Sequence, residues 1–369
     1  MGKGIIADSH QGNFSAARSA ALREADVILV LGARLNWILG FGLPPKWNAN
    51  AKIIQVDISP EELGKNGGDP VLSVVGDVGL VVEQIMSQLG SWQCDKTKSD
   101  FEKNLLASKS KNEDKAAKRA AVGDLPMAYE KAFNVIKDTL NSLSTPANGD
   151  IVYVSEGANA MDISRSIFTM EHPRIKLDAG TYATMGVGLG YSIAAYAAYN
   201  FANPEGSAGK RERKKIVAIE GDSAFGMSGM ELETMSRFQM DILIFVMNNS
   251  GLYQGDAYER EQYTQKQTYS VGADAGMGKG LRATSLGFET DYQKIAEYAG
   301  GLGIVARTPE ELKKATEDGF KSKLPTVVNV IIDPNPGMEM VSTSFHASLW
   351  LRCFDLVREG ASTSMPIAC

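Results

Sequence analysis

The sequence has few cysteines and few histidines. Its 369 residues include three of each, and the cysteines, Cys94, Cys353 and Cys369, lie far apart in the chain. Because they are so few and so scattered, a disulfide framework and a cysteine-based zinc site are excluded. A reducing, intracellular compartment is the expected location. The scarcity of histidine argues against chemistry built on paired histidines.

Long apolar runs and an excess of positive charge are also missing. No apolar run reaches the roughly 18 residues that a membrane-spanning helix needs, and the first residues lack the apolar core of a signal peptide. Lysine and arginine number 38 against 44 aspartates and glutamates, which gives a net charge of −6. A general nucleic-acid-binding protein normally has a basic face. We therefore expect no membrane span and no nucleic-acid partner.

The composition that is present is that of a folded protein of two or three domains, with 44% hydrophobic and 22% charged residues. Within residues 13–90, apolar runs predict strands over 27–31, 52–57 and 71–75, and helical spacing predicts a helix over 78–89. The continuous apolar run at 27–31 is typical of a strand buried on both faces of a parallel sheet. The run Ser59-Pro60-Glu61-Glu62 has the order of a helix start, with an N-cap, a proline and a glutamate.

A second alternation of strands and helices follows residues 95–125, a charged segment that we interpret as a solvated helical linker. Strands are predicted over 151–154, 174–177, 215–219, 242–247, 304–306 and 326–332, and helices over 127–142, 186–200, 227–238, 291–299 and 309–320. Thr308-Pro309-Glu310-Glu311 repeats the capping order found at Ser59. The long segment 250–288 is expected to be a functional loop.

This pattern predicts an α/β fold with two doubly wound parallel-sheet domains. A Rossmann-like domain occupies 1–94, and a second α/β domain occupies 126–335. An atypical tail is assigned to 336–369.

The strongest chemical signal is Gly221-Asp222-Ser223 followed by Asn248-Asn249. Each group stands at the end of a predicted strand, and one βαβ unit joins the two. Because the carboxyl ends of neighbouring parallel strands lie together, Asp222 and Asn249 are expected to face one crevice. A carboxylate, an amide oxygen and a nearby carbonyl suit Mg²⁺ carrying a phosphorylated cofactor. The alternative is an ordinary polar turn at a strand end.

Two further groups of small residues stand near strand ends. Ser155-Glu156-Gly157-Ala158-Asn159 directly follows the strand at 151–154, where its amides could bind a diphosphate. Glycines 186, 188 and 190 open a predicted helix, and they serve either close helix packing or backbone approach to a ligand. The dinucleotide pattern G-x-G-x-x-G is not complete there.

Together these motifs resemble the thiamine-diphosphate enzymes, whose cofactor motif is Gly-Asp-Gly followed by paired asparagines; here its third residue is Ser223. The runs Gly32-Ala33-Arg34-Leu35-Asn36-Trp37, Ser155–Asn159, Glu220–Glu231 and Asn248–Gly255 are similar to the 2-hydroxyacyl-CoA lyase and oxalyl-CoA decarboxylase branch. The resemblance covers roughly residues 1–335, and the Gln254-Gly255 pair favours the lyase.

The resemblance implies roles for particular residues. Mg²⁺ would be held by the side chains of Asp222 and Asn249 and by the carbonyl of Gly251. Residues implied at the thiamine diphosphate are Ala158, Asn159, Ser223 and Ala224 at the diphosphate, Met185 beneath the cofactor, and the backbone oxygen of Ala183, where most relatives have glycine. Tyr253 and Gln254 would lie near the substrate.

In the first domain, the resemblance implies a possible ADP or CoA site at Asp57, Asp77 and Val78. A carboxylate at a strand end suits a ribose hydroxyl. The alternative is that these residues are ordinary polar strand ends.

The reaction implied is cleavage of a 2-hydroxyacyl-CoA to formyl-CoA and an aldehyde. Relatives have a preceding domain with a glutamate that activates the cofactor, and no such motif occurs here, so the catalytic residue is unknown. We expect this chain to be inactive by itself and to need a homo-oligomer or a partner in trans.

The resemblance places such enzymes in the peroxisome, but the chain ends without a peroxisomal tripeptide, which leaves the cytoplasm open. Three alternatives to the lyase remain. They are an oxalyl-CoA decarboxylase, a nicotinamide-dependent oxidoreductase, and a non-catalytic partner subunit that binds a nucleotide or thiamine diphosphate.

Overall fold

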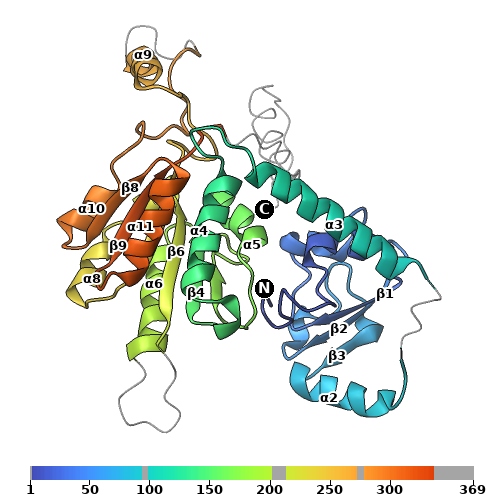
Figure 1. The fold of residues 1–369 in the computed structure, drawn as a ribbon. Helices are drawn as coiled ribbons and strands as arrows, with labels where there is room; N and C mark the ends of the chain where they lie inside the picture. The colour runs from blue at the N-terminus through green and yellow to red at the C-terminus, as the bar shows by residue number, and fades with distance from the viewer. Residues whose placement is uncertain (1, 94–98, 202–212, 272–277, 336–369) are drawn as a thin grey trace, which may run out of the picture. The chain divides into compact units, whose positions relative to one another are not determined.

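The structure, a computed structural model, describes residues 2–93, 99–201, 213–271 and 278–335. They form two parallel sheets, each flanked by helices, which confirms the predicted α/β class (Figure 1). The tail predicted at 336–369 lies outside the described residues. Within the described part, no helix is both long and apolar enough to cross a membrane.

The first sheet has the order β1-β2-β3, and all of its strands are parallel. Its strands are β1 (Val27–Leu31), β2 (Lys52–Asp57) and β3 (Ser73–Val75), and its helices are α1 (Arg18–Glu24), α2 (Val78–Leu89) and α3 (Phe101–Ala120). The charged segment is helical as expected, and Leu105 of α3 packs against Ala17 and Ala20.

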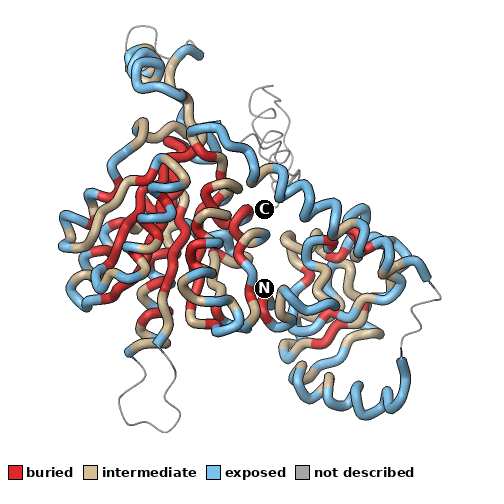
Figure 2. Tube along the Cα trace, in the orientation of Figure 1, coloured by how far each residue is buried: buried red, intermediate tan, exposed pale blue. Residues whose placement is uncertain are grey.

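The prediction that residues 27–31 are buried on both faces is wrong. Val30 is buried in a small core with Leu35, Trp47 and Ile53. Val27 and Leu29, which point to the other face of β1, are 57% and 45% exposed. Figure 2 shows the contrast between this sheet and the more deeply buried second sheet. The physical reason is that β1 is an edge strand of this sheet, whereas on the same face Val56 of the neighbouring β2 is only 2% exposed.

Two local predictions in this part need correction. The Ser59 run forms a single 3₁₀ turn, Pro60–Glu62, and the Ser59 side chain makes no capping hydrogen bond. The third strand begins at Ser73 instead of Val71, because Asp69 caps a 3₁₀ turn at Pro70–Leu72.

The second sheet has the order β5-β4-β6-β7-β9-β8, again with every neighbouring pair parallel. Its strands are β4 (Ile151–Glu156), β5 (Lys176–Asp178), β6 (Lys215–Gly221), β7 (Leu243–Asn248), β8 (Leu302–Ala306) and β9 (Thr326–Ile331). Its helices are α4 (Tyr129–Leu143), α5 (Ala158–Ile167), α6 (Gly188–Tyr196), α7 (Asp222–Ser228), α8 (Glu231–Arg237), α9 (Arg260–Val271), α10 (Gln293–Tyr298) and α11 (Pro309–Lys321).

Helices pack on both faces of this sheet. Helix α4 contacts α5 and α11, whereas α6 contacts α7 and α8, and α8 contacts α10. Every residue of β4, β7 and β9 is buried. This burial on both faces is what the continuous apolar strands require. The rigid centre of the sheet therefore fixes the ends of β4, β6 and β7.

Two helix predictions differ from the structure. The helix expected over 227–238 is two short helices, α7 and α8, and α7 starts directly at Asp222. Glycines 226 and 229 lie near the break, and glycine weakens a helix interior. The segment 250–288 is not loop throughout, because α9 lies within it.

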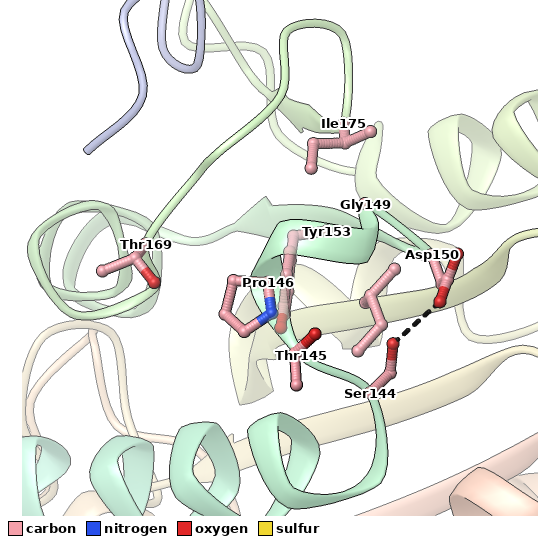
Figure 3. A pocket seen from close by; sticks show the side chains of 9 residues that line it. Ser144, Thr145, Pro146, Gly149, Asp150, Tyr153, Thr169 and Ile175 are labelled. Carbon is pink, nitrogen blue, oxygen red and sulfur yellow. Dashed lines mark hydrogen bonds between the residues drawn. The ribbon is translucent and has the colours of Figure 1, made fainter. Parts of the chain in front are cut away.

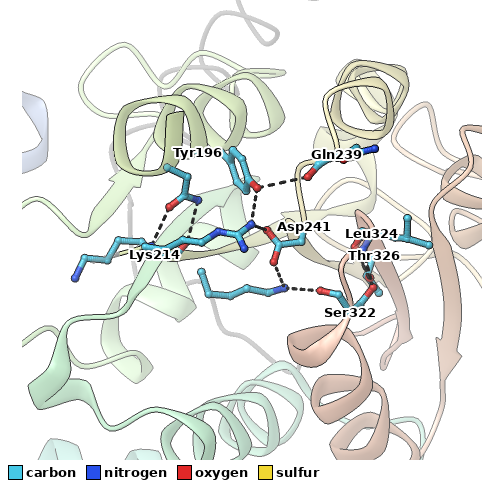
Figure 4. Close-up of polar contacts among 10 residues, drawn as sticks. Tyr196, Lys214, Gln239, Asp241, Ser322, Leu324 and Thr326 are labelled. Atoms are coloured by element: carbon cyan, nitrogen blue, oxygen red, sulfur yellow. Dashed lines mark hydrogen bonds and ion pairs between the residues drawn. The ribbon is translucent and has the colours of Figure 1, made fainter. Parts of the chain in front are cut away.

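A charged network joins the amino ends of β6 and β7 (Figure 4). Asp241, which is buried, accepts a hydrogen bond from Arg213 at 2.6 Å and lies 3.6 Å from the ammonium of Lys215. Arg213 also donates to the hydroxyl of Tyr196, and Lys215 reaches the carbonyl of Ser322. These contacts are at the end of the strands opposite Asp222.

Candidate functional site

The buried carboxylate of Asp222 is the centre of the site. Asp222 is the first residue of α7, directly after β6, and it is 2% exposed. Its Oδ1 accepts the backbone N–H of Ser223 at 2.7 Å, and its Oδ2 accepts that of Gly251 at 3.2 Å. Burial raises the pKa of Asp222 to about 7, and these backbone donors oppose the rise. A carboxylate so dehydrated is well suited to a cation.

Asn249 converges on the same point from the end of β7. Its Oδ1 accepts the same Gly251 N–H at 3.2 Å, so the oxygens of Asp222 and Asn249 share one donor. A side chain at Gly251 would overlap the carbonyl of Gln254, and the turn therefore requires glycine. The two strand ends predicted to meet do so in the structure.

The carbonyl of Tyr253 links this turn to the end of β4. It accepts the side-chain amides of Asn249 at 3.0 Å and Asn159 at 2.8 Å. The Tyr253 ring is 56% exposed, and its backbone has a positive φ of 66°. The backbone N–H of the neighbouring Gln254 donates a hydrogen bond to the carbonyl of Leu252, within the same turn.

Two helix N-termini face this edge of the sheet. Helix α5 begins at Ala158 after Gly157, whose φ is 89°. Gly157 lies so close to Gly221 that an added Cβ would be 3.0 Å from the Gly221 nitrogen. Ala158, Asn159, Ser223 and Ala224 thus all lie in the first turns of α5 and α7. Backbone N–H groups at helix N-termini bind phosphate groups favourably.

A pair of buried glutamates lies beside the site, and no sequence motif predicts a role for them. Glu156 and Glu220 are opposite each other in the β4–β6 register, and both are 0% exposed. The Glu156 carboxylate accepts the backbone N–H groups of Gly186 and Gly188. Burial raises the pKa of both carboxyls, and the charge of Glu156 raises that of Glu220 further. Their position, directly before Gly157 and Gly221, is the signal that could have revealed them.

Through Glu156, the turn at 183–188 is held against the ends of β4 and β6. Ala183 has a left-handed φ of 51°, which explains why glycine suits this position. Both Ala183 and Met185 are exposed, with Met185 at 41%. They are therefore accessible to a ligand at this edge.

In the first sheet, the predicted nucleotide residues lie at strand ends but have local hydrogen-bond partners. The Asp57 Oδ1 accepts the N–H of Ser59 at 2.9 Å. The Asp77 Oδ1 accepts that of Leu80 at 3.1 Å and caps α2. Val78 lies beside Gly32, because a Cβ on that glycine would be 3.4 Å from the valine side chain.

The residues present fit Mg²⁺ and a diphosphate. The donor set combines one carboxylate with amide and carbonyl oxygens, which are the hard ligands that Mg²⁺ prefers. The described residues contain no group of three or more His, Cys, Asp or Glu side chains placed to hold a metal. Mg²⁺ does not need one, because water and phosphate oxygens complete its coordination.

A small cavity at the other end of β4 is not part of this site (Figure 3). It is lined by Ser144, Asp150, Tyr153 and other residues, and its volume is ≈ 10 Å³. A single water needs about 10–15 Å³. This cavity is too small for a cofactor.

The fold and the site are those of a cofactor-binding α/β protein. Two family models match the chain. Residues 156–330 match the C-terminal TPP-binding domain of thiamine pyrophosphate enzymes, and residues 1–85 match their central domain. The chain belongs to the thiamine pyrophosphate enzymes, and it carries their central and C-terminal domains.

Within that family, the chain is similar to 2-hydroxyacyl-CoA lyases and oxalyl-CoA decarboxylases. It is 38% identical to the 2-hydroxyacyl-CoA lyase of Arabidopsis thaliana over 92% of this chain and 55% of that protein. It is also 38% identical to 2-hydroxyacyl-CoA lyase 1 of Homo sapiens, over 90% of this chain and 54% of that protein. It is 36% identical to the oxalyl-CoA decarboxylase of Escherichia coli (strain K12), over 92% of this chain and 54% of that protein. The chain thus spans about half the length of these relatives.

Proposed function

We propose that the second sheet binds thiamine diphosphate together with Mg²⁺ at the ends of β4, β6 and β7. The observation that carries the proposal is the convergence of Asp222 and Asn249 on the N–H of Gly251. The side chains of these two residues and the carbonyl of Gly251 would hold the metal. The match to the C-terminal TPP-binding domain supports this assignment.

The other residues of the site would position the cofactor. Ala158, Asn159, Ser223 and Ala224 would contact the diphosphate from the first turns of α5 and α7. Met185 would support the cofactor from below, and the carbonyl of Ala183 would accept a hydrogen bond from its aminopyrimidine. When bound, thiamine diphosphate supplies a nucleophilic carbon and an electron sink for breaking a carbon–carbon bond.

The reaction we propose is cleavage of a 2-hydroxyacyl-CoA to formyl-CoA and an aldehyde, as the names of several relatives suggest. Tyr253 is exposed beside the site, and with Gln254 it would contact the acyl-CoA. Decarboxylation of oxalyl-CoA is the second candidate, because a relative of nearly equal identity carries that name.

The proposal extends to partners and location. The first sheet would bind ADP or CoA near Asp57, Asp77 and Val78. We propose that catalysis uses a homo-oligomer or a partner in trans. The resemblance favours a peroxisomal or cytoplasmic location.

Calorimetric titration with thiamine diphosphate, with and without Mg²⁺, tests the cofactor site. We expect Mg²⁺-dependent binding that falls by more than about tenfold in Asp222→Ala, because the sole carboxylate of the donor set is removed. Asp77→Ala, in the first sheet, is the control and should leave this affinity unchanged. Equal affinity in Asp222→Ala and wild type would overturn the assignment.

The reaction is tested by incubating the chain, alone and mixed with a full-length relative, with a 2-hydroxyacyl-CoA or with oxalyl-CoA. The relative keeps its activating glutamate but has its own metal-binding aspartate replaced, so that only this chain can supply the cofactor site. Formyl-CoA is measured in both cases. Aldehyde formation identifies the lyase, and carbon dioxide formation identifies the decarboxylase. Product from the chain alone would contradict the expectation that it is inactive by itself.

A further inference from the structure

A cavity at the β5 edge of the second sheet contains charged groups that the proposed cofactor site does not use. Its volume is ≈ 270 Å³, and its lining includes Lys3, Arg165, Lys176 and Asp178. Lys176 and Asp178 belong to β5, and Arg165 belongs to α5. The cavity is far larger than one water requires, and it approaches the roughly 300 Å³ lower bound of small-molecule sites.

Two cationic nitrogens in this lining have no acceptor among the described residues. They are the ammonium nitrogen of Lys176 and Nη2 of Arg165, and both are hidden from solvent. The other nitrogens of Arg165 are fixed, with Nε donating to Asp178 at 2.9 Å and Nη1 to Asp162 at 2.8 Å. These bonds orient the guanidinium and leave its Nη2 without an acceptor.

The nearby carboxylates do not satisfy Lys176. The two oxygens of Asp178 accept the N–H of Gly180 and the Nε of Arg165. Lys3 is paired with Asp8 at 2.7 Å. Burial lowers the pKa of Lys176 to about 7, and Arg165 and Lys3 lower it further, against the opposing charge of Asp178. A dehydrated cation without an acceptor costs several kcal/mol, so the cavity suits an anion.

We propose that this cavity binds the phosphate group of a small phosphorylated molecule, with the ammonium of Lys176 and Nη2 of Arg165 as its ligands. A guanidinium N–H and a lysine ammonium both donate charge-assisted hydrogen bonds to phosphate oxygens. The site is on β5 and α5 and uses neither Asp222 nor Asn249. The phosphate-binding proposal therefore does not depend on whether thiamine diphosphate binds this chain.

The first test is calorimetric titration of the full chain with inorganic phosphate, at constant ionic strength maintained with chloride. We expect saturable binding that falls at least tenfold in Lys176→Met and is largely kept in Lys176→Arg. Lys313→Met, an exposed lysine on α11, is the matched control. Lys176→Met should fold, because it removes no hydrogen bond, and circular dichroism checks this.

The second test separates the sources of the phosphate and the two sites. Displacement of bound phosphate by CoA, but not by dephospho-CoA, would identify the 3′-phosphate of CoA as the ligand. This outcome rests on the proposed function, in which the substrate is an acyl-CoA. Displacement by neither would identify a free phosphate ion. Asp222→Ala should bind phosphate as wild type does. The proposal is overturned if wild type binds no phosphate, or if Lys176→Met binds it as tightly as Lys313→Met.

Discussion

At the scale of single residues, Gly188 shows how closely the buried glutamates are packed. A Cβ at this position would overlap Oε1 of Glu220 and would be 2.8 Å from Oε2 of Glu156. The backbone N–H of Gly188 donates a hydrogen bond to the Glu156 carboxylate. The backbone therefore cannot move away without losing that hydrogen bond. The sequence is compatible with a packing role or a ligand role for this glycine, and the structure shows the packing role.

Gly188→Ala is therefore expected to destabilise the protein by about 1–3 kcal/mol, the usual cost of overpacking. Gly190→Ala, in the same helix, has no atom within 4 Å of the added Cβ and is the matched control. It should stabilise by about 0.5–1 kcal/mol, because alanine is the better helix former. Urea unfolding measures both, and equal effects would contradict the packing role.

Lys176 gives a pH dependence with a definite sign. Its pKa falls from 10.5 in the unfolded chain to about 7 in the folded protein, chiefly through burial, and also through Arg165 and Lys3, with Asp178 opposing. Between these pH values the unfolded chain binds the extra proton, so stability rises with pH.

In phosphate-free buffer, Lys176→Met should be more stable than wild type at pH 7, since it removes a dehydrated cation. The difference should shrink steadily toward pH 10. Thermal unfolding of both proteins across this range measures it. A difference that does not vary with pH would show that Lys176 keeps its ordinary pKa when folded.

At the scale of elements, one sequence pattern has two outcomes. Thr308 accepts the N–H of Glu311 at 3.3 Å and caps the 13-residue helix α11. The same order at Ser59 yields a 3₁₀ turn of three residues without a side-chain cap. Helix α11 packs against α4, whereas the turn at 60–62 is followed by Gly64 and buries no residue. A capping sequence therefore leads to a helix only where the apolar face of that helix packs against another element.

The network at Asp241 is expected to hold the amino ends of β6 and β7. Asp241→Asn leaves the mostly buried ammonium of Lys215 and the half-exposed Arg213 without their carboxylate. We expect a loss of about 1–3 kcal/mol, below the full cost of a broken buried pair because Arg213 meets solvent. Asp318→Asn, which breaks an exposed pair with Lys314 on α11, should cost less than about 0.5 kcal/mol. Urea unfolding compares them, and similar losses would mean that the network contributes no more than a surface pair.

At the scale of the whole molecule, the edge strand β1 of the first sheet exposes apolar side chains on one face. Val27, Leu29 and Leu31 alternate along β1 and are 57%, 45% and 38% exposed. An apolar sheet face in contact with water favours association with another surface.

Leu29→Thr should lower the binding of a hydrophobic dye and change stability by less than about 0.5 kcal/mol. Val30→Thr, one residue on and buried, is the control; it should cost about 1–3 kcal/mol because it buries a hydroxyl. Dye fluorescence and urea unfolding measure both variants. A large loss of stability in Leu29→Thr would show that this face is packed in solution.

The sequence by itself determined most strands and the two residues at the centre of the proposed metal site. Asp222 and Asn249 follow consecutive strands of one βαβ unit, and the right-handed crossover brings such strand ends together. Their meeting at Gly251 could therefore be predicted from spacing. The exposure of β1 could not, because burial depends on what covers a face and an apolar run does not encode that.

Only the tertiary structure decided which distant segments meet. Glu156 faces Glu220 because β4 pairs with β6, and Lys176 joins Arg165 because β5 lies at the edge beside β4. Strand order is set by how the helices pack over the whole sheet, and no local pattern of residues records it. For that reason the residues of the proposed cofactor site could be predicted from the sequence, whereas the glutamate pair and the charged cavity beside β5 are seen only in the fold.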